Sequence, residues 1–145
     1  MQLNPAKDQA ERQACFDIRR AVFIEEQNIP EAEEWDTHDE SAVHVLARVG
    51  DAAAGTARVI VDGATAKIGR VAVLVTYRST GLGFALLKAS EEIAREAGCA
   101  MAVLDAQVYA VGFYERLGFV AEGDAFDDGS GILHLRMRKA LTEDA

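Results

Sequence analysis

Hydrophobic positions recur along this chain with two different periods, and these periods predict its helices and strands. Residues 7–22 predict a helix, since small and apolar side chains fall at steps of three and four. That helix can continue to Gln27, before Pro30 stops it. Residues 81–97 predict a second helix with a continuous apolar stripe, ended by Gly98. A shorter helix is expected over residues 109–117.

Short runs rich in β-branched residues predict the strands, which are separated by turns such as Gly50-Asp51 and Asp62-Gly63. The expected strands cover residues 42–49, 54–61, 68–75, 101–104, 119–122 and 132–138. Residues 68–75 are almost entirely apolar, which is typical of a strand covered on both faces. The order predicts one mixed α/β domain over residues 1–145, with a β-α-β-α-β core in its second half.

Residues 31–40 hold six carboxylates in ten positions, with Trp35 as the single aromatic side chain. Such a run predicts a solvated loop. Trp35 is the exception, because its large apolar ring needs a surface to cover.

The charge balance narrows the classes of partner. The net charge is −9, so nucleic acid would be repelled and a cationic amine attracted. Cys15 and Cys99 lie far apart and are expected to be reduced core thiols, and no clustered ligands suggest a metal. The N-terminus lacks a signal-peptide pattern and no apolar run is long enough to cross a membrane, so we expect a cytoplasmic protein.

The segment Arg78-Ser79-Thr80-Gly81-Leu82-Gly83 follows a predicted buried strand and opens a helix. Free N–H groups at a helix N-terminus can hold a pyrophosphate, and glycines allow a close approach of the backbone. The segment is neither a P-loop nor a dinucleotide fingerprint, because Phe84-Ala85 and Leu86 stand where those motifs need other residues. A structural turn without a ligand is the alternative.

A second segment, residues 107–119, points to one coenzyme. Here the chain resembles the GNAT N-acetyltransferase superfamily. The family pattern Gln/Arg-x-x-Gly-x-Gly/Ala is matched by Arg78, Gly81 and Gly83. The pattern Asn-x-x-Ala-x-x-Phe-Tyr-x-x-x-Gly-Phe is matched downstream by Ala110, Phe113, Tyr114, Gly118 and Phe119. Gln107 replaces the usual Asn, so one hydrogen bond to the coenzyme is made by a longer amide or lost.

The resemblance extends over nearly the whole chain and is closest to the ElaA-like branch, through residues 19–27, Asp36, Asp39 and the late His134-x-x-Met137. It implies a mostly antiparallel twisted sheet of six to seven strands with a splayed parallel pair, flanked by about four helices. The family's first strand would have to fit within residues 1–5. Because many relatives pair through late strands, the resemblance also suggests a homodimer.

The resemblance implies acetyl-CoA as the acyl donor and a primary amine as the acceptor, with no metal. Tyr114 would protonate the departing thiolate as general acid. The residues that would bind the coenzyme are Val71, Ala72, Val73, Arg78, Ser79, Thr80, Gly81, Leu82, Gly83, Phe84, Gln107, Phe113 and Tyr114.

The sequence does not decide which residue is the general base or which residues bind the acceptor. Glu26 is the leading candidate base, with Asp36, Asp39, His44 and His134 as alternatives. Phe23, Trp35, Asp36, Asp39, His44 and His134 are the expected acceptor-side residues. Residues 34–39, preceded by Arg19 and Phe23 and followed by Arg58, are also similar to part of the acyl-homoserine-lactone synthases, which bind a cationic substrate with acidic and aromatic groups. A catalytically silent acyl-CoA-binding module is the alternative from another functional class.

Overall fold

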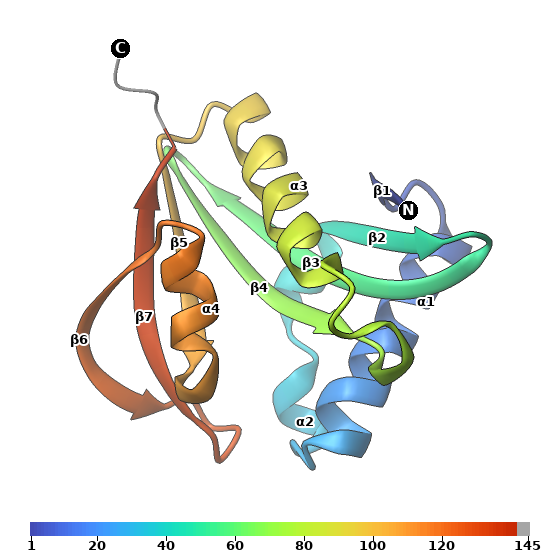
Figure 1. Cartoon of the computed structure of the whole chain (residues 1–145), viewed down its shortest axis with the longest axis horizontal. Coiled ribbons are helices and arrows are strands. Elements are labelled where there is room, and N and C mark those ends of the chain that lie inside the picture. Colours follow the sequence, from blue (N-terminus) through green and yellow to red (C-terminus); the bar gives the residue numbers. More distant parts are fainter. Residues whose placement is uncertain (142–145) are drawn as a thin grey trace.

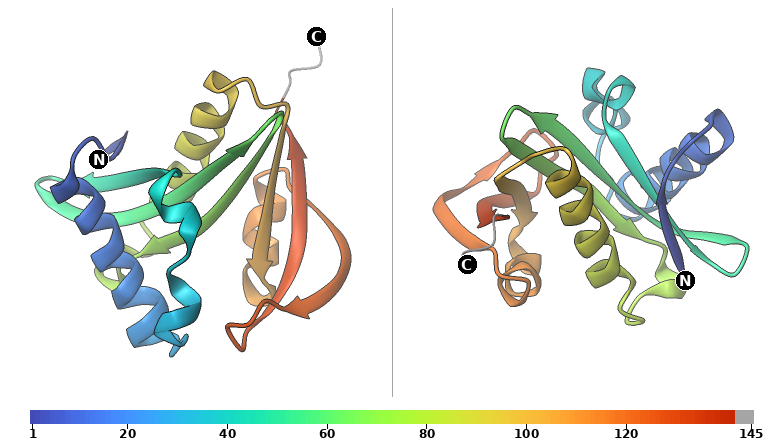
Figure 2. Two further views of the ribbon diagram at one scale, coloured as in Figure 1. Left: turned by 180° about the vertical axis from the view of Figure 1, so that it is seen from behind. Right: turned by 90° about the horizontal axis from the view of Figure 1, so that it is seen from above.

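A seven-stranded, mostly antiparallel sheet organises the computed structural model, which describes residues 1–141 (Figure 1). The strand order is β1-β2-β3-β4-β5-β7-β6, and only β4 and β5 run parallel. Helices α1 and α2 lie on one face of the sheet, and α3 and α4 lie on the other (Figure 2). The expected fold class is confirmed, including the splayed parallel pair.

The strands are β1 (Gln2–Pro5), β2 (Val43–Val49), β3 (Ala52–Asp62), β4 (Thr65–Val73), β5 (Met101–Gln107), β6 (Val120–Asp127) and β7 (Leu133–Ala140). The α-helices are α1 (Gln9–Arg19), α2 (Glu31–Glu34), α3 (Leu82–Glu96) and α4 (Val111–Arg116). A π-helical segment, η1 (Arg20–Glu26), continues α1, and the short 3₁₀ turns are η2 (Thr37–Glu40), η3 (Val75–Tyr77) and η4 (Val108–Ala110). The short strand β1 lies where the family resemblance placed it.

The first helix begins at a side-chain cap. The Asp8 carboxylate accepts the Glu11 N–H at 2.9 Å, and the Glu11 side chain accepts the Lys7 N–H at 2.7 Å. The helix therefore starts two residues later than the periodicity predicts. Its π-helical continuation, which reaches Glu26, buries Phe23. Segments of this kind are frequent at functional sites.

The prediction of a solvated loop at residues 31–40 is wrong. These residues form α2 and η2, and both Glu34 and Asp39 are buried. A buried carboxylate needs a compensating charge, and arginines of α1, β3 and β4 supply it, as described below. A charge run alone does not reveal such partners.

Three strand boundaries differ from the sequence prediction by about three residues or more, and the others by one or two. Strand β4 begins at Thr65, β5 continues to Gln107 and β6 extends to Asp127. The pairing of β3 with β4 shifts at a bulge where Arg70 has a φ of +50°. The bulge interrupts the ladder close to the site described next.

The core lies between the sheet and its helices. Helix α3 buries Leu82, Leu86 and Leu87 against the sheet. Cys15 and Cys99 are both buried and free, as expected for core thiols.

Candidate active site

The parallel strands β4 and β5 separate after a short stretch of pairing. Residues 65–67 pair with residues 101–103. From Ile68 onward this edge of β4 has no strand partner within residues 1–141, while β5 stays paired with β7 as far as Gln107. The diverging strands wall a cavity of about 1040 Å³. Figure 1 shows β4 and β5 diverging from the end at which they pair.

A glycine-rich turn lies between η3 and α3. Gly81 is the N-cap of α3 and has a φ of +84°, in the left-handed region that favours glycine. No side chain caps this helix, so its first N–H groups remain available. A Cβ added to Gly83 would lie 3.5 Å from the ring of Phe113, which places the turn beside α4. This arrangement is suited to binding a pyrophosphate.

Arg78 links two elements at the cavity. Its Nη2 lies 2.7 Å from Glu26 Oε1, and its Nε donates to the Val73 carbonyl at 2.9 Å. Glu26 ends η1 and Val73 ends β4. The carboxylate that the sequence suggests as a base is therefore neutralised by the arginine expected at the pyrophosphate.

Tyr114 contributes a phenol from α4 to the cavity wall. Its ring makes edge contacts with Phe113 and Phe119, at centroid distances of 5.1 and 6.2 Å. Burial, with a smaller effect from Tyr109, raises the pKa of Tyr114 to about 12. The phenol is therefore protonated at neutral pH.

Gln107 lies at the end of β5 and contacts the opposite wall. Its Nε2 donates to Gln27 Oε1 at 2.8 Å. Gln27 immediately follows η1, so this contact joins the first helical layer to β5. The longer amide that replaces the family's Asn is therefore engaged by the side chain of Gln27.

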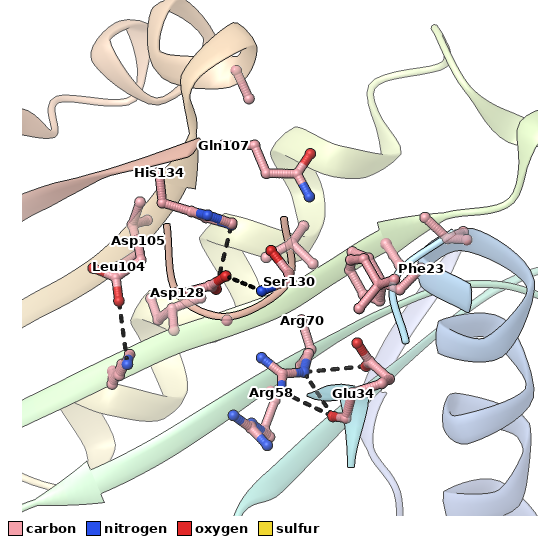
Figure 3. Close-up of a pocket in the computed structure, with 18 of the residues that line it drawn as sticks. Phe23, Glu34, Arg58, Arg70, Leu104, Asp105, Gln107, Asp128, Ser130 and His134 are labelled. Atoms are coloured by element: carbon pink, nitrogen blue, oxygen red, sulfur yellow. Dashed lines mark hydrogen bonds and ion pairs between the residues drawn. The ribbon is translucent and has the colours of Figure 1, made fainter. Parts of the chain in front are cut away.

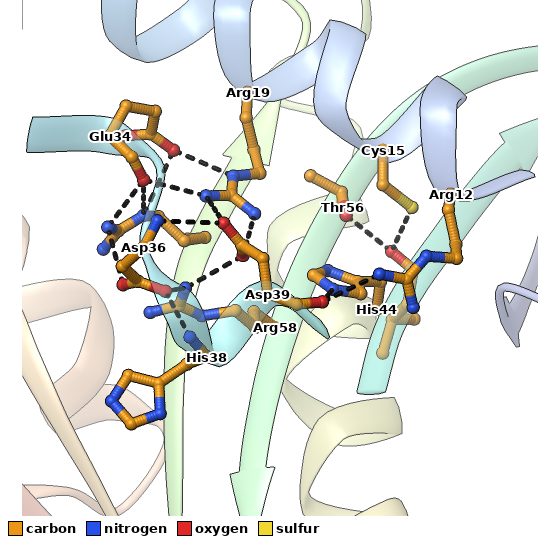
Figure 4. Close-up of polar contacts among 12 residues, drawn as sticks. Arg12, Cys15, Arg19, Glu34, Asp36, His38, Asp39, His44, Thr56 and Arg58 are labelled. Carbon is orange, nitrogen blue, oxygen red and sulfur yellow. Dashed lines mark hydrogen bonds and ion pairs between the residues drawn. The ribbon is translucent and has the colours of Figure 1, made fainter. Parts of the chain in front are cut away.

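The carboxylates of residues 34–39 meet arginines in an arginine–carboxylate cluster (Figure 4). Its members are Arg19, Glu34, Asp36, Asp39, Arg58 and Arg70. Arg19 is fully buried, with Nε 2.8 Å from Glu34 Oε2 and Nη1 2.7 Å from Asp39 Oδ1. Burial alone would raise the pKa of Asp39, but the hydrogen bonds and charges of Arg19 and Arg58 lower it to about 2.

Arg58 and Arg70 compensate the remaining negative charge of the cluster. Arg58 Nη1 lies 2.8 Å from Asp36 and 3.0 Å from Asp39, and Arg70 Nη2 lies 3.4 Å from Asp36. Burial raises the pKa of Glu34 despite the nearby arginine charges. Three positive charges thus balance three negative ones, which weakens the attraction of this segment for a cationic acceptor.

His44 lies away from the cavity wall. Its Nε2 is 2.9 Å from the Asp39 carbonyl oxygen, its ring packs edge-on against Phe16, and burial lowers its pKa. Neither Asp39 nor His44 lines the cavity. The structure thus places these two expected acceptor-side residues in the packing beneath the site.

The turn between β6 and β7 closes the other side of the cavity. Asp128, Ser130 and His134 line this side, and Figure 3 shows the His134 ring pointing inward above Asp128. His134 Nε2 lies 3.6 Å from Asp128 Oδ2. Burial would raise the pKa of Asp128, but hydrogen bonds from Ser130 and the nearby His134 lower it.

Within residues 1–141, no group of three or more His, Cys, Asp or Glu side chains is placed to hold a metal ion. No helix in that part of the chain is long and apolar enough to cross a membrane.

A family model described as an acetyltransferase (GNAT) domain matches residues 5–141. The chain belongs to the GNAT acetyltransferase family. A Bacillus subtilis protein named as an acetyltransferase is 41% identical over 128 residues, which is 86% of each chain. The GNAT family expected from the two sequence motifs is therefore confirmed.

Solved structures share the GNAT fold. Escherichia coli ElaA superposes with a TM-score of 0.84 at 24% identity, covering 95% of this chain and 98% of ElaA. An aminoglycoside 6'-N-acetyltransferase complexed with coenzyme A superposes with a TM-score of 0.79 at 16% identity, covering 100% of this chain and 99% of that one. At these identities the likeness shows the fold.

Most of the site residues expected from the GNAT motifs gather around the cavity. Its wall includes Phe23, Glu26, Trp35, Asp36, Val71, Ala72, Val73, Arg78, Gln107, Tyr114 and His134. Residues 79–84 and Phe113 lie outside the wall, in or beside the turn at α3. Within that turn Leu82 is buried in the core, whereas Phe84 is exposed.

The polar cavity residues to which sequence reasoning gave no role include Arg70, Asp128 and Ser130. The pair Asp128 and Ser130 had a local signal, since the turn that contains them lies just before His134 in the chain. Arg70 had none, because it is brought to the acidic segment only by the sheet.

Proposed function

We propose that this GNAT protein transfers an acetyl group from acetyl-CoA to a primary amine of a small molecule or peptide, by direct attack in a ternary complex. One observation carries the proposal: the β4–β5 cavity has Tyr114 in its wall and the uncapped N-terminus of α3 beside it. An anionic coenzyme and a reacting thioester need these two features side by side.

In this proposal the coenzyme's pyrophosphate binds the N–H groups of residues 79–84, and Arg78 adds a positive charge. The pantetheine arm lies along Val71, Ala72 and Val73, where β4 has lost its parallel partner. An N–H near Val73 polarises the thioester carbonyl. Gln107 and Phe113 complete the coenzyme side.

Tyr114 donates the proton that the departing thiolate needs. Complete transfer from a phenol of pKa about 12 to a free thiolate of pKa about 8.5 would be uphill by about 5 kcal/mol. Donation therefore accompanies cleavage of the C–S bond, and the proton lost by the attacking nitrogen restores the phenol.

Alternative readings of the acceptor side lose support in this geometry. The similarity to acyl-homoserine-lactone synthases rested on the carboxylates of residues 34–39, which are neutralised by arginines. A catalytically silent coenzyme-binding module is an outcome of the test below. The homodimer and the cytoplasmic location are further proposals, made by analogy with relatives and from composition.

The test combines coenzyme binding with thiol release from acetyl-CoA over polyamines, amino sugars, aminoglycosides and peptides with free N-termini. The variants Gly81→Asp and Gly81→Asn have side chains of the same shape and share the same backbone cost at φ +84°, so they differ mainly in charge. We expect Gly81→Asp to bind coenzyme A at least about tenfold more weakly than Gly81→Asn, which corresponds to about 1.4 kcal/mol.

Equal affinities of the two variants would refute the assignment of the turn. Tight coenzyme binding by the wild type, without thiol release on any acceptor, would instead support the silent module.

A further inference from the structure

His134 has a defined hydrogen-bonding state. Its Nδ1 lies 2.8 Å from the Ile132 carbonyl oxygen, which can only accept a hydrogen bond. Nδ1 therefore carries the hydrogen, and in the neutral ring Nε2 presents a lone pair. The side chain is only 8% exposed, so this lone pair has limited access to water.

The atom facing that lone pair is another acceptor. Asp128 Oδ2 lies 3.6 Å from His134 Nε2, and Asp128 Oδ1 accepts the Ser130 N–H at 3.1 Å. A lone pair and an ionised carboxylate oxygen repel each other unless a donor lies between them. Both side chains line the cavity, so a donor can enter from it.

The surroundings favour a cationic donor with more than one N–H. Glu33 of α2 reaches the turn, since a Cβ on Gly129 would lie 2.8 Å from Glu33 Oε2. The β-sheet neighbours of His134, Gln107 on β5 and Phe126 on β6, are uncharged. Among these neighbours of His134 and Asp128, the charged one is therefore the carboxylate Glu33.

Two other carboxylates on the cavity wall, Glu26 and Asp105, already have cationic partners. Glu26 pairs with Arg78, and Asp105 pairs with Arg136 and Lys67. Asp128 is paired with a histidine instead. When that histidine is neutral, no side-chain cation compensates Asp128, whose side chain is 36% exposed to solvent.

We propose that the acceptor's primary ammonium binds between Asp128 Oδ2 and His134 Nε2, and that His134 is the general base. This inference rests on the proposed transferase function and names the class of acceptor, a primary ammonium rather than a neutral or quaternary group. Asp128 orients the ammonium and stabilises the imidazolium that forms.

The proton balance is complete. The ammonium loses one proton to Nε2 and becomes a neutral amine, which forms the N–C bond as the C–S bond breaks. The nitrogen's second proton replaces the one that Tyr114 gives to the thiolate. The products are an N-substituted acetamide, coenzyme A as its thiol, and one proton on His134 that passes to water.

The first experiment tests the binding site without requiring chemistry. Imidazole ¹⁵N spectra of the wild type are recorded during titration with putrescine, and separately with 1,4-butanediol and tetramethylammonium. The His134 signal is assigned by its loss in His134→Asn. We expect putrescine to shift the Nε2 resonance, the two control compounds to leave it unchanged, and Asp128→Asn to weaken the response at least about tenfold. An Nε2 resonance unmoved by putrescine, or an undiminished response in Asp128→Asn, overturns the site.

The second experiment tests the role as base, with the amine that gives the fastest thiol release. His134→Asn should lower kcat by at least about 10²-fold, abolish the acidic limb of the pH profile and leave coenzyme affinity unchanged. Asp128→Asn should mainly raise KM for the amine. Asp124→Asn, which changes an exposed carboxylate of β6 outside the cavity wall, should match the wild type. Wild-type kcat in a folded His134→Asn variant overturns the base assignment. A shifted Nε2 resonance without thiol release on any amine would keep the binding site but refute the transferase.

Discussion

Replacing Arg19 with Met tests whether the arginine–carboxylate cluster holds residues 31–40 in place. The guanidinium is fully buried and bonds Glu34 and Asp39 at 2.8 and 2.7 Å. It also lies 4.9 Å from the Trp35 ring. Methionine keeps much of the side-chain volume but leaves two largely buried carboxylates with fewer partners.

Breaking a buried ion pair from one side costs about 3–5 kcal/mol. Arg58 and Arg70 remain to compensate the carboxylates, so we expect Arg19→Met to lower the free energy of unfolding by about 3 kcal/mol. Urea denaturation, followed by circular dichroism and by the fluorescence of Trp35, measures this change.

Arg20→Met is the matched control. Arg20 is the next residue, but it pairs with Glu31 at the exposed surface. Because surface pairs contribute little, this variant should unfold at the urea concentration of the wild type. If both variants unfold alike, or if Arg19→Met loses less than about 1 kcal/mol, the cluster does not stabilise the fold as argued.

Acid titration gives a second measure of the same cluster. The pKa of Asp39 falls from its ordinary 3.8 to about 2 in the folded protein, which is worth at most about 2.4 kcal/mol before solvent screening. Because the folded pKa is the lower one, this stability is present above pH 3.8 and is lost as the pH falls towards 2. The raised pKa of Glu34 acts in the opposite direction, because it adds stability as the pH falls from that raised value towards 4.5, above the pH range in which Asp39 loses its contribution. Arg19→Met should show a smaller loss between these pH values, and a loss equal to that of the wild type would contradict the assignment.

Two further variants test the coenzyme side. Tyr114→Phe should lower kcat by about 10²-fold without changing coenzyme affinity, since only the transferred proton is removed. Steady-state thiol release measures kcat. An unchanged kcat would mean that solvent, rather than Tyr114, supplies the proton. Glu26→Gln should bind coenzyme A more tightly in calorimetry, because Arg78 no longer shares its charge with a carboxylate, and should keep its kcat. A large loss of kcat in Glu26→Gln would restore Glu26 as the base.

The positions of the turn and of Tyr114, which we expect to bind the coenzyme, were predictable because their signals are local in sequence. The spacing of its glycines and the apolar stripe of α3 that follows predict the turn from Arg78 to Gly83. The structure adds that Gly81 has a φ of +84°. Tyr114 follows from the second motif. Its raised pKa does not, since it depends on burial against Phe113 and Phe119.

The acceptor side was not predictable in the same way, because its contacts join residues far apart in the chain. Glu34 meets Arg70 across 36 positions, and Gln27 meets Gln107 across 80. The sequence therefore suggested carboxylates free to attract an amine. It did not show that Arg70 contacts Glu34 or that Gln27 contacts Gln107. The same lack of long-range information placed His44 on the acceptor side.

The net charge of −9 favoured a cationic acceptor. The arginine–carboxylate cluster changes which carboxylates are able to attract it. Residues 34–39 are close to neutral once Arg19, Arg58 and Arg70 are counted. The carboxylate that faces the cavity with a histidine as its partner is Asp128, on the opposite wall. In the proposed mechanism, selection of the amine falls to Asp128 in the β6–β7 turn, and removal of its proton falls to His134 near the start of β7. Because the turn lies on the wall opposite residues 34–39 and outside the segment from Arg78 to Gly83, we expect substitutions in it to change the choice of amine without changing coenzyme affinity.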